Sequence, residues 1–439
     1  MESEWTLKKI GEFAEVRGGK RLPKGKKLSE KKTTHPYIRV VDFSDGRISL
    51  SNLLYVPEEV FPSIKRYIVE SGDLVISIVG TIGLVAIIPF ELHEANLTEN
   101  AAKILFEEAT IDPQFLSWYL KSSIGKHEIQ RNTVGSTQPK LPLYGIKNIE
   151  VNYPPLPEQR AIAHILGSLD DKIELNRRTN ETLEAMARAI FKSWFVDFDP
   201  VRAKAEGRPT GLPDDIAALF PDSFEDSELG EIPKGWEVRR LSEISKKPQY
   251  GYNASANEEV VGPKFLRIKD INKFDWIDWT TVPYCEIEER NTAKYSLQTG
   301  DIVIARMADP GHAALIEEPV YAVFASYLIR FRPLYEVYDR YLQYWLRSDE
   351  YWKLVRGHQT GSTRANLNAK VLGDFSVLVP DVEIAISFRS YIKPIRDKIL
   401  SNIRESNTLA SLRDTLLPKL ISGELRVPNA EKFIEEAEV

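Results

Sequence analysis

The chain has 439 residues, 43% of them hydrophobic, which suffices for roughly two to four ordinary domains. No run of 18 or more apolar residues occurs and no apolar signal segment opens the chain, so we expect a cytoplasmic protein without membrane spans. The single cysteine, Cys285, excludes a disulfide framework, and six scattered histidines predict no metal site. A net charge of −6 argues mildly against nucleic acid, but eight Lys or Arg and one Glu lie between Arg17 and Lys32.

A long stretch of the sequence occurs twice, about 226 to 228 residues apart. The matched segments are 72–76 and 300–304, 115–120 and 341–346, 135–137 and 361–363, and 171–173 and 397–399. Trp5 and Trp236 open the two copies, and Arg39 matches Arg267. A unit this long exceeds the 20–50 residues of a solenoid repeat, so the pattern predicts a duplicated globular domain followed each time by a helix.

Each copy has the composition of a mixed α/β domain. In residues 1–155, β-rich runs at 37–41 and 73–79 alternate with turn residues, and 115–120 has the apolar face of a helix. Residues 236–380 repeat this order. The irregular spacing of the strands predicts a curved or partly closed sheet with helices, and not a doubly wound parallel sheet.

Each domain is followed by a segment with a heptad pattern, 156–197 in the first copy and 381–425, which includes a closing segment, in the second. Each pattern predicts a helix of about 38 residues. The predicted seam residues are Ile162, Leu166, Leu169, Ile173, Asn176, Asn180, Leu183 and Ile190 in the first helix, and Ile392, Ile395, Ile399, Asn402, Leu409 and Leu416 in the second. We expect the two helices to pack on each other, with Asn176 or Asn180 facing Asn402 or Ser406. The alternative is that each helix packs elsewhere and leaves its asparagines exposed.

Three further features complete the chain. Residues 198–235 carry many Pro and Gly residues, which predicts an extended connector that either wraps a partner or is a plain linker. Residues 426–439 read as an acidic tail. Pro394 lies in the second heptad pattern, and we expect it near the start of that helix, in the first turn or at a kink.

No arrangement of residues points to catalysis. Residues 18–27 resemble a phosphate-binding loop, but Lys20 stands where the motif needs Gly and Lys27 where it needs Ser or Thr. Residues 80–83 are too short for a dinucleotide fingerprint, and no nucleophile elbow occurs. We therefore predict no catalytic residue and no metal ligand.

Polar and basic loops in corresponding places predict binding to DNA instead. Arg, Lys, Gln and Asn read base edges, while Ser, Thr and backbone amides hold phosphates. The candidates in the first copy are Lys20, Arg21, Lys24, Lys26, Lys27, Thr81, Arg131, Ser136, Thr137, Gln138 and Lys140. Those in the second are Gln249, Tyr250, Tyr252, Asn253, Arg306, Arg356, Ser362, Thr363, Arg364 and Asn366. The alternatives are a solvated surface loop for the lysine run and ordinary turns for the two Gly-Ser-Thr segments.

Over nearly its whole length the chain resembles the DNA specificity subunits of type I restriction-modification systems. The resemblance rests on residues 155–163 (PLPEQRAIA), 169–176 (LDDKIELN), 191–200 (FKSWFVDFDP) and 416–425 (LLPKLISGEL). The second copy departs from the pattern where its helix begins, because residues 380–385 (PDVEIA) replace Pro-Leu-Pro-Glu-Gln-Arg. The heptads that follow this departure are intact.

The resemblance implies an α+β fold with two target recognition domains, residues 1–155 and 236–380, separated by two long helices that form an antiparallel coiled coil. Each domain is expected to read one half of a split, asymmetric site in double-stranded DNA, and the coiled coil to set the gap. Two methyltransferase subunits and restriction subunits are the expected partners in a prokaryotic cytoplasm. S-adenosylmethionine, ATP and Mg are expected in those partners, with no cofactor and no catalysis in this chain.

Two other interpretations remain open on the sequence. One is a coiled-coil scaffold for protein interactions without sequence-specific DNA reading, which salt-sensitive DNA affinity distinguishes. The other is a specificity subunit of a system that only methylates, which differs in its partners.

Overall fold

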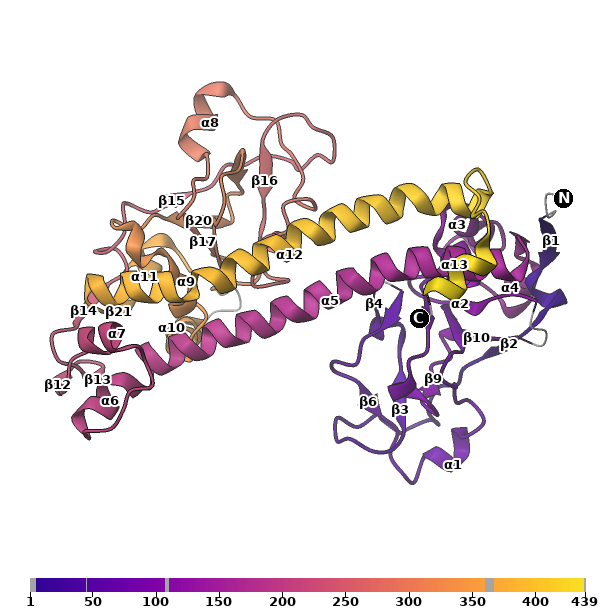
Figure 1. Ribbon diagram of the computed structural model, residues 1–439, viewed down its shortest axis with the longest axis horizontal. Helices are drawn as coiled ribbons and strands as arrows, with labels where there is room; N and C mark the ends of the chain where they lie inside the picture. The colour runs from indigo at the N-terminus through magenta and orange to yellow at the C-terminus, as the bar shows by residue number, and fades with distance from the viewer. Residues whose placement is uncertain (1–4, 45, 107–109, 360–366, 438–439) are drawn as a thin grey trace. The chain divides into compact units, whose positions relative to one another are not determined.

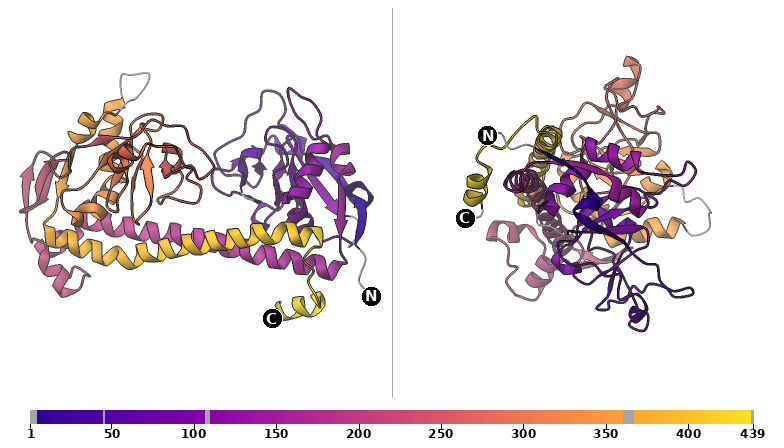
Figure 2. Two further views of the ribbon diagram at one scale, coloured as in Figure 1. Left: turned by 90° about the horizontal axis from the view of Figure 1, so that it is seen from above. Right: turned by 90° about the vertical axis from the view of Figure 1, so that its right-hand side faces the viewer.

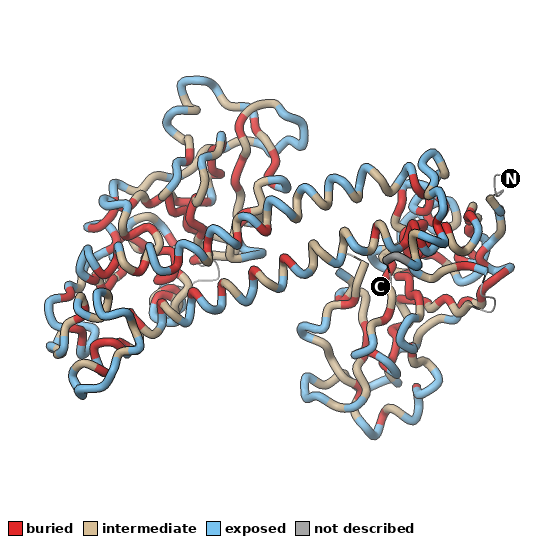
Figure 3. The backbone as a smooth tube through the Cα atoms, viewed as in Figure 1, coloured by how far each residue is buried: buried red, intermediate tan, exposed pale blue. Residues whose placement is uncertain are grey.

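The computed structural model describes residues 5–44, 46–106, 110–359 and 367–437 (Figure 1). The chain divides into two compact units: unit 1 is Met1–Glu174 with Thr408–Val439, and unit 2 is Leu175–Asn407. In each unit the buried residues gather on the strands and the inner helix faces, while the loops are exposed (Figure 3). None of the helices in the described ranges has both the length and the apolar character needed to cross a membrane.

Unit 1 is built on short sheets. The largest is antiparallel, with the strands in the order β2 (Ala14–Gly18), β10 (Ala101–Phe106), β7 (Leu74–Ser77) and β8 (Val85–Ile87). The others are β6 (Leu54–Tyr55), β3 (Pro36–Ile38) and β9 (Asn96–Leu97); β1 (Thr6–Lys9) with β11 (Glu150–Tyr153); and β4 (Phe43–Ser44) with β5 (Arg47–Ile48). All four residues of β7 are buried, and this strand lies between β10 and β8 in the sheet.

Among its described residues, unit 1 has five helices besides the long ones, and of these α2 and α4 pack against its largest sheet. The five helices are α1 (Phe61–Ile64), α2 (Pro113–Lys121), α3 (Ser123–Arg131), α4 (Leu143–Asn148) and α13 (Ala430–Ala437), with 3-10 turns at Ile10–Glu12, Val40–Asp42 and Phe90–Leu92. Helix α2 begins where the Asp112 carboxylate accepts the N–H of Phe115 at 2.9 Å, a standard N-cap. Its apolar face, predicted at 115–120, packs on the sheet together with Ile162 and Leu166.

Unit 2 repeats this plan. Its four-stranded antiparallel sheet has the order β15 (Gln249–Tyr250), β20 (Leu328–Phe331), β17 (Ile302–Ala305) and β18 (Ala313–Leu315). The remaining strands are β16 (Lys264–Leu266) parallel to β19 (Ala322–Phe324), β14 (Glu237–Arg240) with β21 (Ser376–Val379), and β12 (Phe224–Ser227) with β13 (Gly230–Pro233). Its shorter helices are α6 (Asp199–Ala205), α7 (Asp214–Leu219), α8 (Glu289–Tyr295), α9 (Asp339–Trp345), α10 (Asp349–Gln359) and α11 (Ala369–Gly373), with 3-10 turns at Ile268–Asp270 and Glu336–Tyr338.

The duplication extends to individual polar contacts. In unit 1 the Lys103 ammonium donates to the carbonyl of Ile68 at 2.8 Å and lies 3.5 Å from Asp73. In unit 2 the Arg330 guanidinium donates to the carbonyl of Ser296 at 2.6 Å and lies 3.7 Å from Asp301. In both domains, therefore, a largely buried cation at an equivalent position holds a loop against the sheet.

The arginine that recurs in the two sequence copies, Arg39 or Arg267, also makes the same contact in both domains. Arg39 forms a two-pronged ion pair with Asp42, with the closest atoms 2.7 Å apart, and Arg267 pairs with Asp270 at 2.9 Å. Each pair closes a 3-10 turn directly after a strand. The recurrence of this arginine is thus explained by a local structural role.

Two long helices, α5 (Leu156–Phe195) and α12 (Val382–Ser422), contribute to both units. They lie side by side in antiparallel orientation within each unit (Figures 1 and 2). In unit 1, Asp170 pairs with Arg413 at 2.6 Å, and Ile162 shares a core with Leu420. In unit 2, residues further along α5 meet residues earlier in α12, and the Phe195 ring packs edge-on against Phe388 with 5.0 Å between the centroids. Every predicted seam residue is buried or half-buried.

A layer of asparagines lies in the middle of the helix pair, within unit 2. The Asn402 amide donates to Asn180 Oδ1 at 2.9 Å, and the Asn176 amide reaches Glu405 at 2.9 Å and Ser406 at 3.3 Å. All three asparagines are almost fully buried, and Asn402 Oδ1 has no hydrogen-bond partner among the described residues. Such a layer costs stability and fixes the register of two helices.

This layer leads to a test by double substitution. We expect Asn180→Leu alone to lower the free energy of unfolding by about 1–3 kcal/mol, because it leaves the Asn402 amide buried without an acceptor. Asn180→Leu with Asn402→Leu should recover most of that loss, since both polar groups are then gone. Denaturant unfolding of wild type, Asn180→Leu, Asn402→Leu and the double variant measures the coupling. A double variant less stable than the sum of the single changes predicts would contradict the expectation.

A buried ion-pair network, which the sequence did not predict, joins both long helices to the domain of unit 2. Arg396 of α12 pairs with Glu184 of α5 and with Glu317, which follows β18. Glu317 also pairs with Arg340 at 2.7 Å. Although burial raises the pKa of Glu317, Arg396 and Arg340 outweigh it and hold the pKa at about 2.

The depressed pKa predicts how stability changes with pH. Because the folded pKa of Glu317 lies below its ordinary value of about 4.5, its contribution is complete above pH 4.5 and is lost as pH falls toward about 2. Glu317→Gln should be less stable than wild type at pH 7, and the difference should shrink as pH falls through this window. Thermal unfolding between pH 7 and pH 2.5 measures it; a constant difference would contradict the assignment.

The prediction that residues 198–235 form an extended connector is wrong. The segment folds into α6, α7 and the β12–β13 hairpin within unit 2, and it buries Phe198, Val201, Phe220 and Ile232 in the core. The Phe220 ring packs edge-on against Trp194 of α5 at 5.2 Å. The Pro and Gly residues mark the turns between short elements, and the aromatic residues between them provide the packing.

The C-terminal segment is likewise folded and not a simple acidic tail. Arg426 donates two hydrogen bonds of 2.6 Å to the Glu158 carboxylate, and the Phe433 ring on α13 lies 5.8 Å from His164 on α5. These contacts all lie within unit 1. Pro394 lies inside α12 and beyond its first turn, so the first-turn alternative for this proline is wrong.

Candidate nucleic-acid interface

In unit 1 the strand register brings several loops to one end of the four-stranded sheet. β2 ends at Gly18, opposite Ala102 near the start of β10. β7 ends at Ser77, opposite Ala101, and β8 starts close by, with Val85 opposite Ile76. The loops after β2, between β7 and β8, and before β10 therefore leave the sheet together, at the loop end of unit 1.

The basic loop predicted from residue 20 onward starts at this loop end. Lys20 is anchored through its backbone, which donates to Leu97 at 2.8 Å and accepts from the Tyr37 hydroxyl at 2.8 Å. Its ammonium lies over the Tyr67 ring, 5.7 Å from the centroid. Arg21 pairs with Glu99 at 3.0 Å with three quarters of its side chain exposed, and Lys24, Lys26 and Lys27 are exposed.

A polar hairpin reaches the same end. Val134 and Lys140 exchange two backbone hydrogen bonds of 2.9 Å, and Leu141 donates to the carbonyl of Ile78, just after β7. The hairpin turns at Gly135, whose φ of +89° suits glycine. Ser136, Thr137, Gln138 and Lys140 are exposed on it, and exposed Thr81 follows β7. Arg131 is exposed too, but it pairs with Glu128 and Glu150 at 3.3 and 3.2 Å.

At the corresponding end of unit 2, an arginine lies against a tyrosine. The Arg306 guanidinium lies over the Tyr250 ring at 5.1 Å, and the Tyr250 hydroxyl accepts the N–H of Ala369 at 3.0 Å. Leu367 donates to the carbonyl of Arg306 at 2.9 Å, so the segment after residue 366 begins beside this pair. Asn253 and Arg356 are exposed. The candidates Ser362, Thr363, Arg364 and Asn366 lie outside the described residues.

Gln249 has an internal role in the structure. Its amide donates to the carbonyl of Lys294 at 3.1 Å, and its oxygen accepts from Arg330. Both ends of the side chain are therefore engaged within unit 2, and the structure does not present Gln249 for reading a base.

The strand registers also pair the candidates of the two copies. Gly19 and Gly251 occupy equivalent places, and a Cβ on either would collide with the carbonyls of the neighbouring loop, at residues 97–98 and 324–325 respectively. The residue after each glycine, Lys20 or Tyr252, lies against an equivalent tyrosine, Tyr67 or Tyr295. Lys20 makes a cation–π contact there, whereas Tyr252 packs ring to ring at 5.2 Å. The two domains thus present different side chains from one framework.

Comparison with known proteins identifies the family. A family model described as "Type I restriction modification DNA specificity domain" matches residues 2–185 and again residues 233–405. The chain belongs to this DNA specificity family. The MjaIX specificity subunit of Methanocaldococcus jannaschii is 26% identical and covers 97% of this chain and 94% of its own length. The HindI specificity subunit of Haemophilus influenzae is 28% identical over 66% of this chain and 72% of its own length.

A solved structure supports the same fold. The type I system S subunit from M. genitalium aligns with a TM-score of 0.55 at 15% identity, and the alignment covers 95% of this chain and 96% of that subunit. The predicted fold class, two mixed α/β domains with two long paired helices, is confirmed by the repeated match to the DNA specificity family and by this fold.

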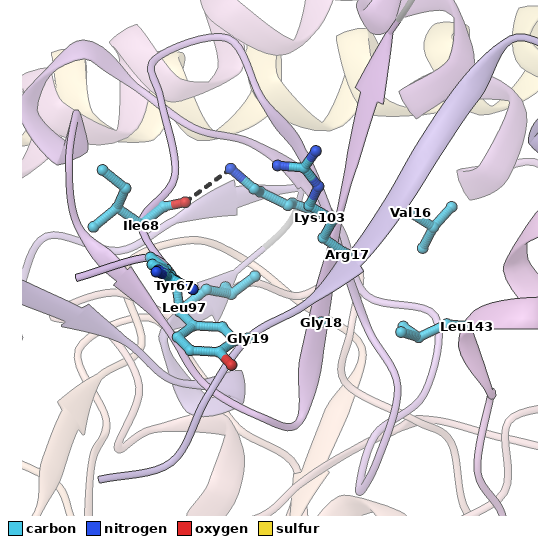
Figure 4. A pocket seen from close by; sticks show the side chains of 10 residues that line it. Val16, Arg17, Gly18, Gly19, Tyr67, Ile68, Leu97, Lys103 and Leu143 are labelled. Atoms are coloured by element: carbon cyan, nitrogen blue, oxygen red, sulfur yellow. Dashed lines mark hydrogen bonds between the residues drawn. The ribbon is translucent and has the colours of Figure 1, made fainter. Parts of the chain in front are cut away.

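Sequence reasoning missed four residues at the loop end of unit 1: Arg17, Arg66, Tyr67 and Lys103. They line a pocket of about 320 Å³ beside the basic loop (Figure 4). One signal was available, because Arg66-Tyr67 recurs as Lys294-Tyr295 at the offset of 228 that other front segments share. A cation followed by tyrosine in both copies of a DNA specificity domain marks a shared part of the surface.

Proposed function

We propose that this DNA specificity subunit reads a split site in double-stranded DNA, with one half recognised by the domain of unit 1 and the other by the domain of unit 2. The observation that carries the proposal is the duplicated sheet, which delivers basic and polar loops from the same end in both units. Exposed Lys, Arg, Ser and Thr side chains suit phosphates, and Gln, Asn and Arg suit base edges. Because the side chains differ between the domains, the two half-sites differ.

The long helices fit the role of a spacer. A helix rises about 1.5 Å per residue, so a continuous helix pair fixes the separation of whatever its ends carry. The buried asparagine layer and the Asp170–Arg413 pair hold the two helices in one register. A fixed register in turn gives a fixed gap between the half-sites.

The partners in this proposal are two methyltransferase subunits and the restriction subunits of a type I system. In this proposal the specificity subunit recognises the DNA site. The partners carry out S-adenosylmethionine-dependent methylation of adenine N6 and ATP- and Mg-dependent restriction. The support for these partners is membership of the family and the name "type I restriction enzyme" that its relatives carry.

Selection from a pool of randomised duplexes tests the proposal. The chain, assembled with its methyltransferase subunit, should enrich two short conserved blocks separated by unspecified bases of constant number. A scaffold that does not read DNA would enrich no motif, and a single continuous motif would show that only one domain reads. Repeating the selection at two salt concentrations separates specific enrichment from retention by charge.

A further inference from the structure

The pocket at the loop end of unit 1 has the composition of an anion site. It lies where β2 ends, between that strand and residues 66–68, and three cations line it: Arg17, Arg66 and Lys103. Figure 4 shows two of them, Arg17 and Lys103. No acidic residue is among the described residues that line it. Tyr67 and Leu143 supply apolar walls. This combination suits a phosphate together with the sugar attached to it.

Two of these cations face each other across paired strands. Lys103 of β10 lies directly opposite Arg17 of β2, so both side chains project from the same face of the sheet. Like charges in directly opposed positions destabilise a sheet. Glu15 pairs with Arg17 at 2.5 Å and Asp73 lies 3.5 Å from Lys103, and both acids stand outside the lining of the pocket.

Arg66 gives the pocket its unmatched charge. Among the described residues, none forms an ion pair or a hydrogen bond with its guanidinium, and its side chain is exposed at the pocket. The neighbouring Tyr67 carries Lys20 of the basic loop over its ring. The pocket therefore continues directly into the surface that the basic loop forms.

At the equivalent position in unit 2, the side chains bind one another. Gln249 stands where Arg17 stands, directly opposite Arg330, and accepts a hydrogen bond from it. Lys294, the counterpart of Arg66, has its carbonyl bound by Gln249 and its ammonium over the Tyr295 ring at 5.1 Å. Unit 2 thus has a neutral glutamine opposite its arginine, where unit 1 has two cations opposite each other.

We propose that the pocket of Arg17, Arg66, Lys103 and Tyr67 holds a phosphate of the DNA backbone next to the first half-site, a contact that unit 2 lacks. This assignment rests on the proposed function. It makes the first domain the more firmly anchored of the two on DNA of any sequence, because a phosphate contact carries no sequence information.

The test compares variants of the full chain, assembled with its methyltransferase subunit, on a short duplex at several salt concentrations. Each phosphate contact contributes about 0.9 to the slope of log affinity against log salt, so Arg66→Gln should lower that slope by about 1 and the affinity about five-fold at 0.15 M salt. Arg17→Gln, which copies the arrangement of unit 2, should do the same and keep its thermal stability. The matched control is Lys65→Gln, an adjacent exposed cation outside the pocket lining, which should leave the slope unchanged.

Equal losses in Arg66→Gln and Lys65→Gln would overturn the proposal, because the effect would then come from the general positive field. No loss in Arg66→Gln and Arg17→Gln would also overturn it. If wild type itself fails to bind any duplex, the proposed function fails, and a second readout examines the pocket alone. Inorganic phosphate should then raise the melting temperature of wild type above that in chloride of equal ionic strength, and not that of Arg66→Gln. Selective stabilisation by phosphate without any change in DNA affinity would assign the pocket to a free anion and overturn the DNA contact.

Discussion

Replacing Arg396 with methionine should lower the free energy of unfolding by about 3 kcal/mol, the largest loss expected from a single substitution in the helix pair. The Arg396 side chain is only 1% exposed, and its two partners, Glu184 and Glu317, are 3% and 7% exposed. Removing the cation leaves two buried carboxylates with fewer partners. The expected loss stays at the low end of the 3–5 kcal/mol range for broken buried pairs, because Arg347 and Arg340 still pair with these acids.

The matched control for this change lies one helical turn earlier. Lys393 forms an exposed i,i+4 pair with Asp397, so Lys393→Met should change stability by less than about 0.5 kcal/mol. Arg396→Lys should be intermediate, since an ammonium keeps the charge but not the two-pronged geometry. Denaturant unfolding followed by tryptophan fluorescence measures all three. Equal effects of Arg396→Met and Lys393→Met would show that the network does not stabilise the fold.

Lengthening both long helices by one heptad should abolish recognition of the original site and create recognition of a longer one. Seven residues inserted after Glu174 and seven after Asn407 fall at the boundaries of the two units, so they leave the contacts within each unit intact. Seven residues add about 10 Å to a helix, which corresponds to about three base pairs of DNA. The half-sites should stay the same and the gap should grow by about that number.

A phase-breaking insertion is the control for this experiment. Five residues at the same two places keep the helices long but turn the seam by about 140°, so the complex should lose stable site recognition. Sequencing of the sites methylated by each variant gives the gap directly. An unchanged gap in the seven-residue variant would refute the role of the helices as a spacer.

The periodic parts of the fold could be predicted from the sequence, and the reason is local. Ile162, Leu166, Ile392 and Ile399 repeat at heptad spacing, so their burial on a shared seam follows from the geometry of a helix. The position of Asn402 in that repeat also predicted an asparagine layer. The bounds of α5 and α12 lie within a few residues of the predicted bounds. The agreement is close because prolines and a glycine end each pattern clearly.

Contacts between distant segments could not be predicted. Nothing in the heptads of α12 shows that Arg396 is buried, because its partners lie on α5 and in a loop after β18. The prolines of segment 198–235 predict an extended connector, but its fold depends on aromatic packing. Phe220 packs against Trp194, and Phe198 packs against Trp236. The candidate interface was likewise predictable only where its residues are neighbours in the sequence. Runs of lysine were visible in the sequence, whereas the opposition of Arg17 and Lys103 depends on a strand register that only the fold provides.

The most direct test of the central claim is a map of N6-methyladenine in a host without its own methylation that co-expresses this chain and its methyltransferase partner. The proposed function predicts new methylation at a split motif, with two different half-sites and a gap of constant length. A complex that assembles and yet adds no new methylation, or methylates a single continuous motif, would contradict the claim that the two domains read two halves of one site.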